Sequence, residues 1–233
     1  MNFELSEEQK MIQQNVERFV QDNYDLPKRV ELSSQDPGYS KDYWNSMAEL
    51  GWLGLPFNEE DGGFGGNQID TLVIMEQFGK GLVLEPFLAN VVLGGGAIQI
   101  GGSEELKNEM LSSLIEGSKQ LTLAYAEQQS RFDLEDVATS ARQEGDKYII
   151  NGQKSMVLNA ESSDHIVVVT RTNGGQVDEE GITLFLVDSD SKGLERNNFP
   201  TVDGLRASEI TFDNVEVNSE RMIGDLNKGF IIL

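Results

Sequence analysis

The chain has 233 residues and a formal net charge of −22, which results from 18 Lys and Arg against 40 Asp and Glu. Acidic residues spread along the whole length repel phosphate backbones and anionic lipid, so we expect no nucleic acid and no membrane surface among its partners. The lack of cysteine excludes disulfides, thiolate nucleophiles and cysteine-ligated metals.

The N-terminus lacks the basic and apolar regions of a signal peptide. No apolar run approaches the roughly 20 residues that span a bilayer. We therefore expect a cytoplasmic protein, and the 38% hydrophobic content suits a packed core.

The first half of the chain has the apolar spacing of helices. Ser6-Glu7-Glu8-Gln9 has the pattern of a capping box, which predicts a helix over residues 6–23. Ser40 predicts the start of a second helix, which ends at Gly51. Three further helices are expected over residues 67–81, 86–100 and 104–116.

Two glycine-rich stretches leave alternatives open. Residues 58–66 follow no predicted strand and precede no Lys-Ser/Thr, so a mobile loop with positive-φ turns is favoured over a phosphate cradle. The Gly94-Gly95-Gly96 run lowers helix propensity by roughly 1 kcal/mol per residue relative to alanine. Close packing against another backbone or a ligand would explain this run, and a local kink is the alternative.

From residue 120 onward the apolar period approaches two, as in strands. Asn151-Gly152 is typical of a type I′ hairpin turn. Other turns are expected at Gly145-Asp146, Asn173-Gly174-Gly175 and Asp213-Asn214. Short strands without intervening helices favour an antiparallel barrel or sandwich. The candidate strands are residues 120–126, 139–144, 147–150, 165–170, 183–187 and 209–212.

The expected fold class is α+β, with an all-α domain over residues 1–118 and a β-domain over residues 119–222. Residues 223–233 hold a loop and the first turn of an apolar helix. We expect them to be the start of a further helical domain, so that the chain is cut at a domain boundary.

Five motifs stand in order along the whole chain: Leu5-Ser6-Glu7-Glu8-Gln9; Glu49-Leu50-Gly51-Trp52-Leu53-Gly54-Leu55-Pro56 with Glu60-Asp61-Gly62-Gly63; Ala126-Glu127; Gly145-Asp146-x-Tyr148-Ile149-Ile150-Asn151-Gly152-Gln153-Lys154; and Phe212-Asp213-Asn214-Val215-x-Val217. In this order and spacing the chain resembles the acyl-CoA dehydrogenase family. The resemblance implies a helical N-terminal domain, an antiparallel β-barrel middle domain and a C-terminal four-helix domain, of which the third is missing here.

The resemblance also implies a reaction. Family members bind FAD, remove two hydrogens across the Cα–Cβ bond of an acyl-CoA, and pass electrons to an electron-transfer flavoprotein. Their carboxylate base usually lies in the C-terminal domain. We therefore expect no catalytic residue in this chain, and no metal ligand.

The likeness departs from the common pattern at three places. Typical members have Thr-Glu-Pro, Gly-Ser-Asp and Trp-Ile-Thr where this chain has Ala126-Glu127-Gln128, Arg131-Phe132-Asp133 and Met156-Val157-Leu158. With Asp203-Gly204-Leu205-Arg206-Ala207, these departures resemble the small subunit of pimeloyl-CoA dehydrogenase and its relatives. That subgroup implies an oligomer, either of identical chains or with a larger acyl-CoA dehydrogenase subunit.

The resemblance assigns Arg131 and Phe132 to substrate binding. Arg131 either meets a ligand phosphate or a distal carboxylate, or forms an ion pair with Asp133 or Glu135. Glu127 is expected to order the loop under the flavin rather than to be a solvated acid. The residues assigned to the flavin are Tyr125, Ala126, Glu127, Met156, Val157 and Leu158.

Three other polar residues are expected to be structural. Lys154 is interpreted as a cation that stabilises a loop, and Arg206 as a buried structural group. His165 enters an apolar strand without a second ligand at metal-binding spacing.

The expected function is that of a fragment of a flavin-dependent acyl-CoA dehydrogenase, inactive as it stands, whose substrates include a dicarboxylyl-CoA such as pimeloyl-CoA. The alternative is a non-catalytic partner subunit that has lost flavin binding. A third hypothesis is a flavin monooxygenase with the same fold.

Overall fold

The computed structural model describes residues 4–233, which form two compact units. The first unit runs to Glu85 and includes Ile115–Gly117. The second contains Pro86–Leu114 and Ser118–Leu233. The domain boundaries expected at residues 118 and 222 stay predictions.

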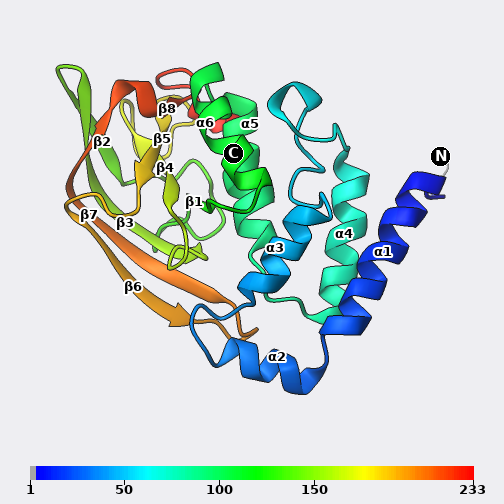
Figure 1. Ribbon diagram of the computed structural model, residues 1–233. Coiled ribbons are helices and arrows are strands. Elements are labelled where there is room, and N and C mark those ends of the chain that lie inside the picture. Colours follow the sequence, from blue (N-terminus) through cyan, green and yellow to red (C-terminus); the bar gives the residue numbers. More distant parts are fainter. Residues whose placement is uncertain (1–3) are drawn as a thin grey trace. The chain divides into compact units, whose positions relative to one another are not determined.

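The first unit is helical, as predicted (Figure 1). Its elements are α1 (Glu7–Asn23), α2 (Leu26–Ser33), α3 (Lys41–Glu49), the 3₁₀ turn η1 (Glu59–Asp61) and α4 (Gln68–Gly81). Helix α1 lies beside α4, where Gln9 Nε2 donates to Asp70 Oδ1 at 3.0 Å. Helix α2 was not predicted; Asp25 accepts a hydrogen bond from Lys28 N at its start.

Side-chain caps explain where three of these helices begin. Ser6 forms the predicted capping box with Gln9, and Ser40 accepts from Tyr43 N at the start of α3. Asn67 caps α4 with the help of Asp70. The glycine-rich stretch is a loop, as predicted, and Gly62 and Gly65 both have positive φ.

The second unit contains the helices η2 (Leu88–Gly95, a π-helical segment), α5 (Gly96–Gly101) and all of α6 (Glu104–Ile115) except its last residue. The single helix predicted over residues 86–100 is therefore divided between η2 and α5. A Cβ atom on Gly94 would lie 2.8 Å from Leu121 Cβ and 3.1 Å from Thr122 N. Of the two explanations for the glycine run, close backbone packing is the one that Gly94 supports.

Eight strands form one sheet in the order β6-β7-β3-β2-β4-β5-β8, and β1 pairs with β4 (Figure 1). The sheet is mixed, because β1 runs parallel to β4. The antiparallel hairpin of β2 and β3 lies between these two strands in the chain. The predicted class, a helical domain followed by a sheet domain, is confirmed. The strands are β1 (Leu121–Ala124), β2 (Ser140–Glu144), β3 (Lys147–Leu158), β4 (His165–Arg171), β5 (Ile182–Asp188), β6 (Leu194–Pro200), β7 (Arg206–Asn218) and β8 (Met222–Ile223).

Two predicted turns are wrong. Asn151-Gly152 lies inside β3 and Asp213-Asn214 lies inside β7, where the two strands pair. Ile150 pairs with Val215 and Gly152 with Phe212. The single residue Asn151 of β3 therefore lies opposite two residues of β7, Asp213 and Asn214. This is a β-bulge, in which Asn214 takes the positive φ that a turn would also need.

One hydrophobic core of the second unit lies on one face of the sheet, and β4 and β5 are also buried on their other face, for example at Val167 and Leu184. Tyr148, Val157 and Phe185 are buried in this core with aliphatic residues of β4 and β7. Strands β6 and β8 were not predicted, since the first is largely polar and exposed and the second has two residues. Within residues 4–233 no helix combines the length and apolar character needed to cross a bilayer.

Candidate functional site

The segment after β1 and the end of β3 lie side by side. Ser155 N donates to Ala126 O at 2.9 Å, and Thr122 Oγ1 donates to Leu158 O at 2.6 Å. The structure therefore brings together the two parts of the predicted flavin wall. We call Tyr125, Ala126, Met156, Val157 and Leu158 the wall.

A buried ion pair fixes the first part of the wall to β3. Lys154 Nζ lies 2.7 Å from Glu127 Oε1, and the two side chains are 0% and 3% exposed. The same ammonium group donates to Tyr125 O at 3.1 Å. This geometry agrees with the interpretation of Lys154 as a loop-stabilising cation.

Glu127 also orders the loop that follows, residues 125–139, which we call the β1–β2 loop. Its carboxylate accepts from Ala138 N at 2.9 Å, Thr139 N at 3.0 Å and Gln129 Nε2 at 2.8 Å. These hydrogen bonds and the charge of Lys154 satisfy a carboxylate that is removed from water. Of its two interpretations, the solvated acid is therefore wrong.

The pair changes the proton affinity of both partners. Burial raises the pKa of Glu127, but the charge of Lys154 and the hydrogen bonds outweigh it, so that this pKa is lowered overall. Burial lowers the pKa of Lys154 to about 8, against the opposing attraction of Glu127. The energetic balance of the pair is thus set by desolvation against mutual attraction.

The wall exposes apolar side chains. Tyr125 is 39% exposed and Met156 is 50% exposed, whereas Val157 is buried. Met156 has a φ of 52°, which holds it in the left-handed region at the end of β3. The Ala126 N–H has no acceptor among the described residues. The wall thus offers an apolar surface and a backbone donor.

Arg131 and Phe132 lie in the exposed part of the β1–β2 loop. Phe132 is 97% exposed, and Arg131 has a φ of 50°. Within residues 4–233, Arg131 forms no ion pair with Asp133 or Glu135. The described structure gives the ion-pair alternative no support, and the assignment of Arg131 to substrate stays a prediction.

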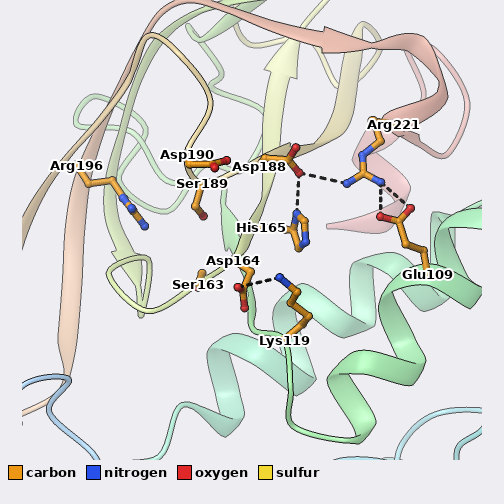
Figure 2. Close-up of a pocket in the computed structure, with 10 residues that line it drawn as sticks. All are labelled: Glu109, Lys119, Ser163, Asp164, His165, Asp188, Ser189, Asp190, Arg196 and Arg221. Atoms are coloured by element: carbon orange, nitrogen blue, oxygen red, sulfur yellow. Dashed lines mark hydrogen bonds and ion pairs between the residues drawn. The ribbon is translucent and has the colours of Figure 1, made fainter.

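His165 lines a cavity of about 640 Å³ elsewhere in the second unit (Figure 2). Its side chain is 13% exposed and its Nδ1 lies 2.8 Å from Asp188 Oδ1, in agreement with a structural role. The ion pairs drawn in Figure 2 are Lys119–Asp164, His165–Asp188, Arg221–Asp188 and Arg221–Glu109. The wall residues do not line this cavity.

Arg206 begins β7 and is half-buried, and its carbonyl accepts from Asn159 N at 2.9 Å. Arg171 was not predicted to be structural, yet its guanidinium donates to four backbone carbonyls, one of them in the β1–β2 loop. No side-chain motif could have revealed it, because every partner is main-chain oxygen.

Comparison with known proteins gives the family. The model of the acyl-CoA dehydrogenase N-terminal domain matches residues 6–118, and that of the middle domain matches residues 122–215. The probable acyl-CoA dehydrogenase YngJ of Bacillus subtilis is 31% identical over 235 residues, covering 99% of this chain and 61% of that protein. Subunit CarC of the caffeyl-CoA reductase-Etf complex of Acetobacterium woodii is 29% identical over 233 residues, covering 97% and 60%.

A solved acyl-CoA dehydrogenase from Geobacillus kaustophilus has a TM-score of 0.87 at 26% identity, covering 100% of this chain and 62% of that one. A helical domain followed by this mixed sheet is the architecture of such oxidoreductases. The chain belongs to the acyl-CoA dehydrogenase family by its N-terminal and middle domains. It spans between 54% and 62% of the length of the curated relatives that it matches.

Proposed function

We propose that the chain is part of a flavin-dependent dehydrogenase that oxidises the Cα–Cβ bond of an acyl-CoA. The observation that carries this proposal is the wall, in which Ala126 and the end of β3 are held together and Lys154 is buried against Glu127. FAD, the cofactor of this family, would supply the hydride acceptor when bound.

The wall residues fit a flavin ring in part. Tyr125 and Met156 expose apolar and polarisable surface on which a ring can pack. The Ala126 N–H is available to a ring oxygen or nitrogen. Ala126 and Leu158 bring no side-chain donor, so the hydrogen bonds to the flavin come from the backbone.

Arg131 and Phe132 are proposed to contact the substrate. Both side chains are exposed and can reach a ligand. A guanidinium binds phosphate or carboxylate oxygens in pairs. It therefore suits a CoA phosphate or the distal carboxylate of a dicarboxylyl-CoA such as pimeloyl-CoA.

The base that takes the α-proton is proposed to lie outside this chain. Glu127, the carboxylate that the motif brings to the wall, is buried and already bound by Lys154 and three other donors. It cannot accept a substrate proton without losing those contacts. The chain by itself is therefore proposed to be inactive.

A visible spectrum and an electron-acceptor assay test this proposal. The purified chain and the full-length protein are each incubated with FAD and assayed with pimeloyl-CoA and octanoyl-CoA. We expect dehydrogenation by the full-length protein, with electron-transfer flavoprotein as acceptor, and none by the chain alone. Turnover by the chain would contradict the placement of the base, and a full-length protein with no flavin and no turnover would contradict the enzyme.

A second candidate is a partner subunit that completes the site of a larger acyl-CoA dehydrogenase subunit and binds no flavin itself. The missing side-chain donors at Ala126 and Leu158 favour it. A count of FAD per subunit in the reconstituted oligomer separates the two functions. One FAD on each subunit would exclude the partner role, and FAD only on the larger subunit would exclude the enzyme role.

A further inference from the structure

Arg171, the last residue of β4, is surrounded by backbone carbonyls. The residue is 9% exposed. Its Nη1 donates to Asp178 O at 2.7 Å and to Glu180 O at 2.9 Å. Its Nη2 donates to Glu135 O and to Gln176 O, each at 2.8 Å. Four oxygens thus converge on the two ends of one planar guanidinium.

The four carbonyls belong to two different loops. Glu135 lies in the β1–β2 loop, and the other three lie in residues 172–181, which we call the β4–β5 loop. Arg171 has no carboxylate in ion-pair contact within the described chain. Burial lowers its pKa, while the charges of Asp178, Glu127 and Asp136 act in the opposite direction. The fork geometry, rather than an ion pair, fastens the loops together.

Two further hydrogen bonds join the two loops. Val137 N donates to Gln176 O at 3.0 Å, and Gln176 Nε2 donates to Asp136 Oδ1 at 2.6 Å. The Gln176 contact to Asp136 is exposed to water, where a hydrogen bond contributes little net stability. Arg171 is the buried and charged contact between the loops.

The exposed part of the β1–β2 loop lies between two buried anchors. Glu127 holds its beginning through Lys154, and Arg171 holds its end through Glu135. Arg131 and Phe132 lie between these anchors. Both side chains are exposed, so neither is fixed by packing in the core. Their placement therefore depends on the two ends of the segment.

We propose that Arg171 is a positioning residue, which holds Arg131 and Phe132 in place for acyl-CoA by fastening the β1–β2 loop to the β4–β5 loop. The ligand in this inference rests on the proposed function, whereas the placement of the loop does not. Arg171 itself touches neither substrate nor flavin in this scheme.

Trypsin and guanidinium ion test the placement of the loop. In the full-length protein, Arg171→Ala should speed cleavage after Arg131 by about tenfold, because proteolysis follows the population of the opened loop. Millimolar guanidinium chloride should slow cleavage again, because a free guanidinium ion can bind the four carbonyls that Arg171 leaves (the carbonyl cage). Sodium chloride at equal ionic strength should not slow it. Arg142→Ala, which removes an exposed arginine of β2, is the matched control and should leave the rate unchanged.

Binding of CoA and pimeloyl-CoA by calorimetry tests the ligand. We expect weaker binding by Arg171→Ala, restored by guanidinium, and partial loss in Arg171→Lys, whose single ammonium group lacks the fork. An unchanged cleavage rate in a folded Arg171→Ala protein would overturn the proposal, as would unchanged CoA affinity despite faster cleavage. If the wild type binds neither compound while cleavage responds as expected, the proposed function fails and the positioning of the loop stands.

Discussion

Lys154 and Glu127 lie 2.7 Å apart with neither side chain more than 3% exposed, so the charge of each depends on the other. Removing one partner leaves a buried charge without compensation. Lys154→Met should therefore destabilise the protein by about 3–5 kcal/mol in urea unfolding followed by circular dichroism.

Two variants control this experiment. Glu127→Gln combined with Lys154→Met should recover part of the loss, because no isolated charge remains. Lys119→Met breaks a partly exposed pair with Asp164 and should change stability by less than about 1 kcal/mol. A loss below about 1 kcal/mol for Lys154→Met would show that the pair is not buried in solution.

The same pair predicts a dependence of stability on alkaline pH. The pKa of Lys154 is lowered by burial from 10.5 to about 8 in the folded protein. Between these values the unfolded chain binds more protons than the folded chain, so this contribution to stability increases as pH rises. The free energy of unfolding should rise relative to Lys154→Met from pH 8 to pH 10. Parallel curves for the two proteins would refute the assignment.

At acid pH the stability depends on Glu127, the other member of the pair. The pKa of Glu127 is lowered, so its contribution is complete above its ordinary value of 4.5 and is lost as pH falls through the lowered value. The free energy of unfolding of wild type and Glu127→Gln, measured at a series of acid pH values, gives this contribution. The wild type should lose more stability than the variant below pH 4.5.

Gly94 and Gly96 give a matched pair of substitutions. Gly94→Ala places a Cβ 2.8 Å from Leu121 Cβ and 3.0 Å from Leu121 C, so we expect a loss of about 1–3 kcal/mol. A Cβ on Gly96 meets nothing within 4 Å, so Gly96→Ala should stabilise by up to about 1 kcal/mol through helix propensity. Thermal unfolding of the two variants checks this, and equal effects would contradict the close approach to β1.

Glu85 predicts a pH effect in the first unit. Tyr24 donates its hydroxyl to Glu85, Ser40 N donates to it at 3.1 Å, and burial raises the pKa of its carboxyl. The folded state then binds more protons than the unfolded state above pH 4.5, so stability falls as pH rises. Glu85→Gln should become progressively more stable than wild type from pH 4.5 upward. Glu60→Gln, an exposed site, is the control.

Local signals predicted the helices, whereas long-range pairing decided the strands. The caps at Ser6 and Ser40 depend on residues within one turn, so sequence alone revealed them. Asn151-Gly152 favours positive φ in a turn and in a bulge alike. The choice between them depends on Asn214, 63 residues away, whose N–H donates to Asn151 Oδ1. No local pattern contains that information.

The site follows the same division. Glu127 and Lys154 are 27 residues apart, and the sequence indicated each as an ordering group without indicating that they pair. Arg171 lies outside every motif, since its four partners are carbonyl oxygens that any residue type supplies. The three-dimensional path of two loops, rather than their composition, defines its role.

The carbonyl cage of Arg171 has a consequence for how such a protein can diverge. Because the guanidinium binds only main-chain oxygens, its four acceptor atoms are present whatever side chains stand at residues 135, 176, 178 and 180. Substitutions of the side chains of the two loops are then compatible with the same relative placement of their backbones. The surface side chains of the two loops can thus change during evolution while the backbone contacts to Arg171 stay the same.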